Sequence, residues 1–341
     1  MKYLFIILCF VLVMEAKDYS KDTKVQAFIT SLIQEYGMQK VKLDKLFAHV
    51  QVYKVPLRMF AKKSKTTHKP STPKSSHKRK IKHGTWEKYS RFKFNKTMVY
   101  RGVQFIKKYQ KIFDTVEKTY GVPSAYIAAI IGIETMYGRN VGRYRVFDNL
   151  VTLAFEENRR NRFFKKELKK FLHLAQREGF NPRNVKGSYA GAIGMGQFMP
   201  SNYEAYGVDY DADGRITLQK AGDAIASVAN YFKKNGWKKG EVIAEKVHYD
   251  GKRFDRLKTG YTTSYTRELL KDIRSDERWN HDQKIRLIKL NKKDYDELWF
   301  AAKNFFVITR YNHSSYYAMS VHQLAEKIEK KRDENKPHNG Q

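Results

Sequence analysis

The chain has 341 residues, of which 41% are hydrophobic and 14% aromatic, which suffices for one large core or two moderate ones. This composition excludes an intrinsically disordered protein. Lys and Arg number 67 against 35 Asp and Glu, giving a formal net charge of +32. Such a surface attracts polyanions of any kind, so the charge alone does not distinguish nucleic acid from anionic cell-wall polymer or lipid.

The first residues have the pattern of a secretory signal peptide. A lysine precedes an apolar stretch, and Ala16 then precedes a polar segment. An uncleaved anchor is the alternative, but an apolar stretch of about 12 residues is short for a bilayer span of roughly 20. We therefore expect residues 1–16 to be removed. Cys9, the only cysteine, leaves with them, which excludes disulfides and cysteine-ligated metals in the mature chain.

Residues 17–61 carry helical periodicity interrupted at "EYGMQK", and they predict an N-terminal region of two or three short helices. Residues 62–84 follow, rich in Lys, Ser and Thr and without an acidic residue. Such a segment buries no core, so we expect a flexible basic linker. A solvated connection is its simplest role, and a dedicated binding arm is the alternative.

The rest of the chain predicts a mainly α fold with a small β-containing part (α+β). Helical patterns dominate residues 85–237, where Pro123 marks the start of a new helix. The stretches "EVIAEKVHYDG" and "IRLIKL" have the pattern of short strands, so residues 238–294 are expected to form a small α/β insert. Residues 295–331 are expected to complete the helical core, and residues 332–341 to form a frayed tail.

One carboxylate stands inside an apolar helical pattern. In "AAIIGIETMYG", Glu134 shares a helix face with three isoleucines. Burial raises the pKa of a carboxyl group, and a carboxylic acid that stays protonated near neutral pH can donate a proton to a leaving oxygen. A structural glutamate paired with Arg139 or Arg143 explains the pattern equally well.

A second segment, "GSYAGAIGMGQFMPSNY" (residues 187–203), is rich in glycine, which lets a ligand approach the backbone closely. Ser188 and Gln197 add donors and acceptors suited to hydroxyl and acetamido groups. No phosphate-binding glycine signature is present in the sequence, and an ordinary turn is the simpler explanation.

The acidic segment 209–223 matches the first half of an EF-hand calcium loop. Aspartates stand at relative positions 1, 3 and 5, and a glycine stands at position 6. Lys220 replaces the glutamate expected at position 12, and an aspartate at position 15 would close a longer loop. Asx turns with a helix cap are the alternative. The match favours a metal, for which we expect the ligands Asp209, Asp211, Asp213, the Arg215 carbonyl and Asp223.

A fourth segment, "TRYNHSSYYAM", places Tyr311, Asn312, Tyr316 and Tyr317 near a helix start. Sugar rings stack on aromatic faces and hydrogen-bond through their rims, so this composition suits a glycan groove. A hydrophobic core in which the tyrosine hydroxyls form hydrogen bonds is the commoner explanation of clustered tyrosines. His313 lies in no Ser/His/Asp or HExxH context.

Taken in order, these motifs resemble the membrane-bound lytic murein transglycosylase B family. The matching segments are "IIGIETMYG", "GSYAGAIGMGQFMPSNYEAYGVDYDADG", "SVANYFKKNGW" and "FFVITRYNHSSYYAM". The likeness runs from about residue 22 to residue 328 and implies a lysozyme-like catalytic core.

The resemblance implies a peptidoglycan lytic transglycosylase in which Glu134 is the lone catalytic acid and then the base. The bond cleaved is the β-1,4 linkage between N-acetylmuramic acid (MurNAc) and N-acetylglucosamine (GlcNAc), and the muramyl C6 hydroxyl attacks in place of water to leave a 1,6-anhydro end. One carboxylate suffices because the substrate supplies the nucleophile, unlike the usual pair in glycosidases. The groove contacts that the resemblance implies are Tyr89, Arg159, Arg160, Ser188, Met195, Gln197, Phe198, Tyr231, Tyr311, Asn312 and Tyr317.

The same resemblance implies structural calcium in the acidic loop, no organic cofactor, and a periplasmic monomer in peripheral contact with the wall or membrane. Its partners would be peptidoglycan glycan strands and other cell-wall enzymes. A non-catalytic peptidoglycan-binding scaffold is the alternative, although a pure binder gains little from a desolvated acid. Nucleic-acid binding through the basic linker is a third hypothesis, which export argues against, so we expect no specific nucleic acid.

Overall fold

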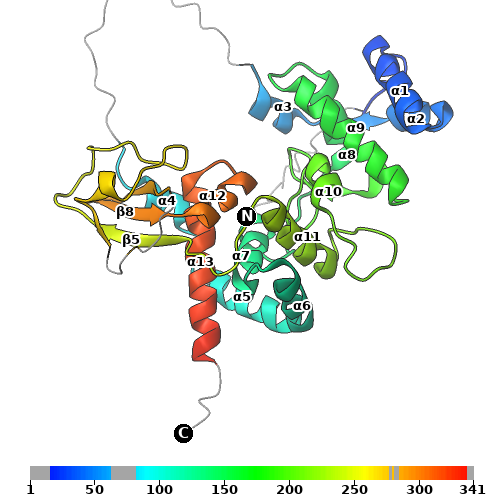
Figure 1. Ribbon diagram of the computed structural model, residues 1–341. Coiled ribbons are helices and arrows are strands. Elements are labelled where there is room, and N and C mark those ends of the chain that lie inside the picture. Colours follow the sequence, from blue (N-terminus) through cyan, green and yellow to red (C-terminus); the bar gives the residue numbers. More distant parts are fainter. Residues whose placement is uncertain (1–15, 63–81, 276–278, 280–283, 336–341) are drawn as a thin grey trace, which may run out of the picture. The chain divides into compact units, whose positions relative to one another are not determined.

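Figure 1 shows a computed structural model of the chain, which describes residues 16–62, 82–275, 279 and 284–335. The predicted signal peptide up to residue 15, most of the basic linker and the last six residues of the predicted tail lie outside the described residues. The described part is mainly helical, as predicted. Its α-helices are α1 (Thr23–Tyr36), α2 (Lys40–Phe47), α3 (Lys54–Phe60), α4 (Thr85–Ser90), α5 (Lys96–Lys108), α6 (Gln110–Tyr120), α7 (Ser124–Thr135), α8 (Val146–Phe155), α9 (Asn161–Arg177), α10 (Pro200–Tyr206), α11 (Ala221–Lys234), α12 (Lys303–Tyr311) and α13 (Ser315–Glu334).

The strands are short and antiparallel. The two-residue strands β1 and β2 pair with each other, and so do β3 and β4. The other four strands form one sheet in the order β6-β5-β8-β7. Their bounds are β1 (Ala16–Lys17), β2 (Val50–Gln51), β3 (Tyr144–Arg145), β4 (Lys186–Gly187), β5 (Ala244–His248), β6 (Arg274–Ser275), β7 (Arg286–Asn291) and β8 (Asp296–Ala301).

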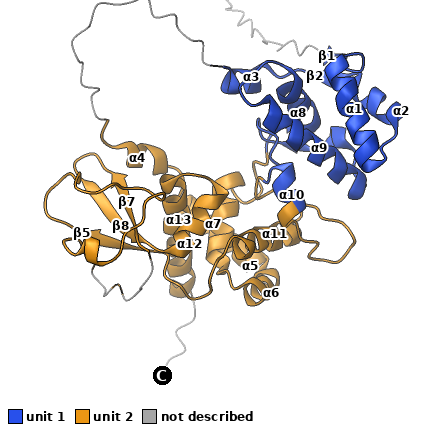
Figure 2. Ribbon diagram, turned by 45° about the horizontal axis from the view of Figure 1, so that its top comes forward, with its two compact units in different colours: residues 1–66, 142–193, 198–204 blue, residues 67–141, 194–197, 205–341 orange. Residues whose placement is uncertain are grey.

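The chain folds into two compact units, coloured separately in Figure 2. The first comprises residues 1–66, 142–193 and 198–204, and the second comprises residues 67–141, 194–197 and 205–341. This division differs from the predicted boundaries, because residues 142–193 group with the N-terminal helices and not with the rest of the predicted core.

Aromatic packing explains why the first unit combines these segments. The ring of Phe28 on α1 meets Phe155 on α8 edge-on at 5.6 Å, and Phe47 on α2 meets Phe147 on α8 at 5.2 Å. The predicted interruption at "EYGMQK" is the end of α1, where Gly37 adopts a left-handed conformation with φ 63°. Residues 17–61, for which two or three short helices were predicted, form the three helices α1, α2 and α3.

In the second unit, α7 is buried around almost its whole circumference and is surrounded by α5, α6, α11 and α13. A side chain at Gly132 would place its Cβ 2.6 Å from the ring of Tyr137, so glycine is required for this close approach. Tyr137 is held by a 2.9 Å hydrogen bond from its hydroxyl to the carbonyl of Met98. Helix α7 ends in a tight turn in which Met136 and Tyr137 both have positive φ, at 51° and 61°.

The four-stranded sheet forms the core of the insert between α11 and α12. Its buried side chains include Phe254, Leu270, Ile285, Leu298 and Phe300. The two predicted strands correspond to β5 and β7, whereas β8 lies in the stretch that is expected from its sequence to complete the helical core. That expectation is wrong for residues 296–301, because the run "DELWFA" pairs with β5 on one side and β7 on the other. From residue 303 onward the stretch is helical as predicted, in α12 and α13.

The insert leaves and rejoins the helical part of the unit at one place. Ala244, the first residue of β5, pairs with Ala301, the last residue of β8. The Ala302 N–H donates to the Ile243 carbonyl at 2.9 Å, and the Asn304 side chain both accepts from the Lys238 N–H at 2.9 Å and donates to its carbonyl at 2.8 Å. Hydrogen bonds thus close the stem of the insert.

Of the helices that the structure describes, none combines the length and the apolar character needed to cross a membrane.

Candidate active site

Glu134 lies in the last turn of α7, and one hydrogen bond defines its position. The Tyr317 hydroxyl, from the first turn of α13, donates to Glu134 Oε1 at 2.6 Å. Glu134 is part-buried, whereas Tyr317 is 2% exposed. Among the described residues Glu134 forms no ion pair, so the structural alternative of a partner at Arg139 or Arg143 is not realised.

The surroundings of Glu134 favour its protonated form. Burial raises the pKa of its carboxyl group, and the Tyr317 hydrogen bond and the charge of Lys93 oppose that rise without cancelling it. Burial also raises the pKa of the Tyr317 hydroxyl well above its ordinary value, so the phenol stays neutral and remains a donor. The pair is therefore an acid held in a fixed orientation by a neutral donor.

Two further tyrosines line the same centre. Tyr311, at the end of α12, stacks nearly parallel to Tyr317 with ring centroids 6.5 Å apart and donates its hydroxyl to the Gly196 carbonyl at 2.6 Å. Tyr231 on α11 meets Tyr311 edge-on at 4.8 Å and donates to the Arg310 carbonyl at 2.7 Å. Burial raises the pKa of Tyr231 to about 12. Both hydroxyls are thus neutral and committed to backbone carbonyls.

The loop of residues 194–197 is fastened beside α7. The Thr135 hydroxyl, next to Glu134, donates to the Met195 carbonyl at 2.8 Å. Gln197 has a positive φ of 52°, and its side-chain amide donates to the carbonyls of Val141 at 3.1 Å and Gly194 at 3.0 Å. The predicted contacts Met195 and Gln197 therefore belong to a rigid loop tied to the end of the helix that carries the acid.

Tyr89, on α4, lies near this centre together with a cation, the ammonium group of Lys93. The Tyr89 ring lies 5.5 Å from the ring of Tyr316, the residue before Tyr317 on α13. Burial raises the pKa of the Tyr89 hydroxyl, and the charge of Glu134 adds to that rise. The Lys93 ammonium lies 4.8 Å from the centroid of the Tyr89 ring. Of the remaining tyrosines in the fourth motif, Tyr316 serves structure, because its hydroxyl is 2.8 Å from the Thr85 hydroxyl and accepts from the Asn291 N–H at 3.1 Å.

Four of the predicted contacts belong to the first unit. Arg159 and Arg160 are exposed at the start of α9, and the Arg160 guanidinium lies 4.0 Å from the centroid of the Phe163 ring. The Ser188 hydroxyl accepts from the Ala192 N–H at 3.0 Å and so shapes its own loop. Phe198 is buried at 2% exposure and pairs through its backbone with Ile193. The exposed arginines can meet an anionic ligand, whereas Phe198 is a core residue.

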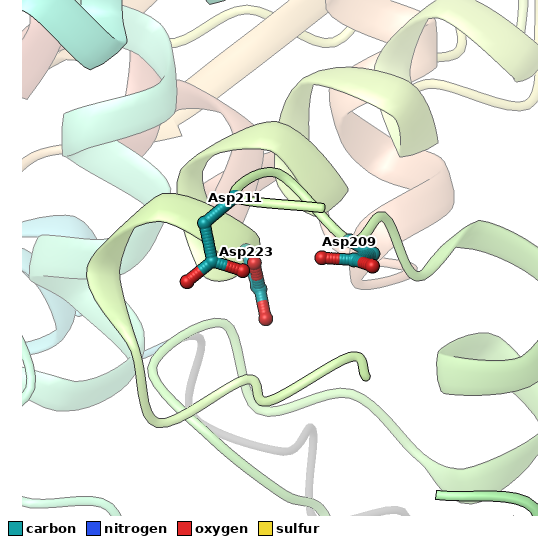
Figure 3. Close-up of side chains that lie close together, drawn as sticks. All are labelled: Asp209, Asp211 and Asp223. Atoms are coloured by element: carbon teal, nitrogen blue, oxygen red, sulfur yellow. The ribbon is translucent and has the colours of Figure 1, made fainter. Parts of the chain in front are cut away.

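Three carboxylates of the acidic loop converge. Ligand atoms of Asp209, Asp211 and Asp223 lie within 4.8 Å of one another (Figure 3). Asp223 is fully buried, and its two oxygens accept from the N–H groups of Tyr210 at 2.9 Å and Thr217 at 2.6 Å. Burial raises the pKa of Asp223, and the charges of the other two aspartates add to that rise. Clustered carboxylate oxygens of this kind suit a hard divalent cation.

Asp213 does not join that cluster. It forms a short ion pair with Lys220, whose ammonium also lies 3.1 Å from Asp211. This contact holds the pKa of Asp213 below its ordinary value. The Arg215 N–H donates to Asp213 Oδ1 at 2.9 Å, which orients the loop at the residue whose carbonyl was predicted as a ligand. The lysine at position 12 thus supplies a counter-charge within the loop.

Comparison with known proteins identifies the family. A family model described as "Transglycosylase SLT domain" matches residues 20–326. The chain belongs to this family. Membrane-bound lytic murein transglycosylase B from Escherichia coli (strain K12) is 36% identical over 315 residues, which cover 91% of this chain and 84% of that protein. The chain is accordingly a lytic transglycosylase with a lysozyme-like fold, as the sequence motifs indicated.

Two solved structures extend the likeness of this transglycosylase. The Escherichia coli lytic transglycosylase SLT35 in complex with calcium is 34% identical, with a TM-score of 0.83 over 94% of this chain and 97% of that one. SltB3 from Pseudomonas aeruginosa in complex with NAG-anhNAM-pentapeptide is 26% identical, with a TM-score of 0.73 over 89% of this chain and 78% of that one.

Eight of the predicted catalytic and groove residues lie in the second unit of the transglycosylase. They are Tyr89, Glu134, Met195, Gln197, Tyr231, Tyr311, Asn312 and Tyr317. Asn312 follows Tyr311 directly and is exposed. Sequence reasoning missed Lys93, which lies in none of the four motifs, and Thr135, which lies in the first motif but has no titratable side chain. The adjacency of Thr135 to Glu134 and the cluster of cations and aromatics in "KYSRFKF" were the signals available.

Proposed function

We propose that Glu134 is the single acid and base of this lytic transglycosylase and that its substrate is the MurNAc–GlcNAc β-1,4 bond of peptidoglycan. The observation that carries this proposal is the 2.6 Å hydrogen bond from the neutral Tyr317 to the Glu134 carboxyl, whose pKa burial raises. The resemblance of the motifs and the names of the relatives support the substrate class.

In the first step, the protonated Glu134 donates its proton to the glycosidic oxygen as the bond from that oxygen to C1 of the muramyl sugar breaks. In the second step, the resulting carboxylate accepts the proton of the muramyl C6 hydroxyl, whose oxygen attacks C1. The product is a 1,6-anhydro end, and Glu134 regains its proton. No second carboxylate is required, because no water is activated and no glycosyl-enzyme bond forms.

The tyrosines favour both steps. Tyr317 orients the acid and stabilises the carboxylate that remains after proton donation, because a hydrogen bond to an anion is stronger than one to a neutral group. Tyr311 bonds to the Gly196 carbonyl and so holds the loop of residues 194–197, and Tyr231 bonds to the Arg310 carbonyl and packs edge-on against Tyr311. We propose both as aromatic contacts to the sugar. Tyr89, Met195, Gln197, Asn312 and the first-unit residues Arg159, Arg160, Ser188 and Phe198 are proposed as contacts to the glycan strand.

The test is mass spectrometry of soluble products after incubation of purified protein with peptidoglycan, with Glu134→Gln as the variant. Glu134→Gln keeps the size of the side chain and removes the acid, so we expect a loss of roughly a hundredfold or more, the usual contribution of general acid-base catalysis. Products from the unaltered protein should be one water lighter than hydrolytic muropeptides. Substantial turnover by Glu134→Gln would show that another group is the acid.

We further propose that the acidic loop holds a structural Ca²⁺. Asp209, Asp211 and Asp223 would be its carboxylate ligands. Asp213 and the Arg215 carbonyl would also bind the ion once the ion pair between Lys220 and Asp213 breaks. Calcium bound only to the native state stabilises the fold by mass action. A rise in unfolding temperature on addition of Ca²⁺, absent when Mg²⁺ is added at the same concentration, would support this role, and an unchanged temperature would contradict it.

The proposed setting follows from the first residues. We propose that residues 1–16 direct export to the periplasm and are removed, and that the basic surface keeps the enzyme at the wall or membrane. Its partners there would be glycan strands and other cell-wall enzymes, and the enzyme would act as a monomer. The N-terminal sequence of the protein recovered from periplasmic extract checks cleavage after Ala16.

A further inference from the structure

Lys93 lies at the catalytic centre and is not among the groove contacts that the family motifs imply. It is part-buried in the short segment between α4 and α5, and its ammonium lies 4.8 Å from the centroid of the Tyr89 ring. A lysine with this degree of burial loses hydration, which is costly unless a negative charge or a ring face compensates. Its placement therefore calls for an explanation.

The segment that carries Lys93 is fixed at both ends. The Lys93 N–H donates to the Ser90 carbonyl at 2.9 Å, and the Asn95 side chain caps α5 by accepting from the Met98 N–H at 2.9 Å. The neighbouring Phe94 stacks on Trp86 with centroids 6.0 Å apart. These contacts hold the backbone in one conformation, so the direction of the Lys93 side chain is built into the fold.

The Glu134 carboxyl accepts from the Tyr317 hydroxyl, and two more tyrosines pack next to that contact. Tyr311 stacks on Tyr317 with ring centroids 6.5 Å apart, and the Tyr89 ring lies 5.5 Å from the ring of Tyr316, the residue before Tyr317. Burial raises the pKa of the hydroxyls of Tyr317, Tyr311 and Tyr89. Among the described residues, Lys93 is the cation whose charge acts on Glu134. Burial lowers the pKa of Lys93, and the charge of Glu134 opposes that fall, so the ammonium is favoured when the carboxylate is ionised.

We propose that Lys93 is a positioning residue of the reaction: its ammonium, held against the Tyr89 ring, stabilises the Glu134 carboxylate that exists between proton donation and proton return. This inference rests on the proposed function, in which Glu134 is first an acid and then a base. Without a nearby cation, a buried carboxylate costs more free energy to form, which raises the barrier to proton donation in the first step. Lys93 and Tyr317 together make that ionised state accessible.

The test is the pH dependence of product release from soluble, uncrosslinked glycan strands by Lys93→Met, Lys93→Gln and Lys93→Arg. The acid must be protonated in the free enzyme, so kcat/KM falls as pH rises through the pKa of Glu134. Removing the cation removes a cause that lowers this pKa, so the descending limb should move to higher pH in Lys93→Met and Lys93→Gln. We also expect kcat to fall about fivefold, which corresponds to roughly 1 kcal/mol of charge interaction. Lys93→Arg keeps the charge and should retain the original profile.

Lys96→Met is the matched control, because it removes a lysine that is exposed at the start of α5 and should leave the profile unchanged. An unshifted limb in both Lys93→Met and Lys93→Gln, with unfolding temperatures equal to that of the unaltered protein, would overturn the inference. So would an equal shift in Lys93→Arg, since a structural role would then explain all three variants. Activity retained by Glu134→Gln would instead overturn the proposed function itself.

Discussion

The two acidic sites of the second unit are built on opposite principles. Glu134 stands alone, part-buried among neutral tyrosine hydroxyls, and burial raises its pKa. In the acidic loop, three carboxylates converge, and Lys220 neutralises part of their charge through Asp211 and Asp213. A bound proton removes the charge of a single buried carboxylate and so reduces its desolvation penalty. A bound cation offsets the repulsion between several carboxylates that lie close together. The first arrangement suits proton transfer and the second suits metal binding.

After the loss expected for Glu134→Gln, the next largest effect on activity is expected at Tyr317, and it distinguishes the Glu134 site from the acidic loop. Tyr317→Phe removes the donor to Glu134, so the carboxylate loses a stabilising hydrogen bond and its pKa rises further. We expect kcat to fall about tenfold, a modest value for the loss of one positioned donor, and the descending limb of kcat/KM to move to higher pH. Tyr100→Phe, which alters an exposed tyrosine on α5, should leave both unchanged. An unaltered kcat in Tyr317→Phe would mean that this hydrogen bond is dispensable.

A change in the acidic loop is expected to affect the stability of the protein. Asp223 is buried and accepts two backbone N–H groups, so Asp223→Asn should lower the free energy of unfolding by about 2 kcal/mol even without calcium. It should also abolish stabilisation by calcium. Urea unfolding in EDTA measures the loss of stability without calcium, and the same experiment in Ca²⁺ measures the stabilisation by calcium. Asp211→Asn, at an exposed position, is the control that should lose the calcium effect while keeping the stability measured in EDTA.

Glu134→Gln should make the protein more stable near neutral pH. Because burial raises the pKa of Glu134, the stability that its protonated form contributes is complete below the ordinary carboxyl pKa of 4.5 and is lost as pH rises through the raised value. The glutamine side chain has no proton to lose, so the variant should gain about 1 kcal/mol at pH 7 relative to the original protein. Thermal unfolding from pH 4 to pH 7 should show a difference that grows with pH, and a constant difference would contradict the assigned direction.

The smallest expected effect concerns Lys220. Its ion pairs are exposed, so Lys220→Gln should lower the free energy of unfolding in EDTA only slightly. The same change removes a cation that competes for Asp211 and Asp213, so the affinity for calcium should rise. Calorimetric titration measures that affinity directly. Lys238, an exposed lysine outside the acidic loop, offers a matched control, since Lys238→Gln should leave calcium binding unchanged.

Much of this structure was predictable from local patterns. The left-handed Gly37 ends α1 where "EYGMQK" indicates a break, and the acidic spacing brings Asp209, Asp211 and Asp223 together. Strand β8 was not predictable in the same way, because a short apolar run such as "LWF" fits a helix or a strand until its partners are known. The roles of individual site residues stay predictions, and Lys93 becomes visible only because the fold brings its charge to Glu134, 41 positions further along the chain.

The closed stem of the insert has an evolutionary consequence. Ala244 pairs with Ala301, and the Asn304 side chain hydrogen-bonds to the backbone of Lys238. The spacing between α11 and α12 is therefore set by these contacts and not by the residues of the insert between Ala244 and Ala301. Tyr231 and Tyr311, one on each helix, would keep their edge-on contact if the residues between the two strand ends were lengthened, shortened or exchanged. A lineage is therefore free to replace this module and acquire new attachments to its surroundings while the tyrosines of the catalytic centre stay in register.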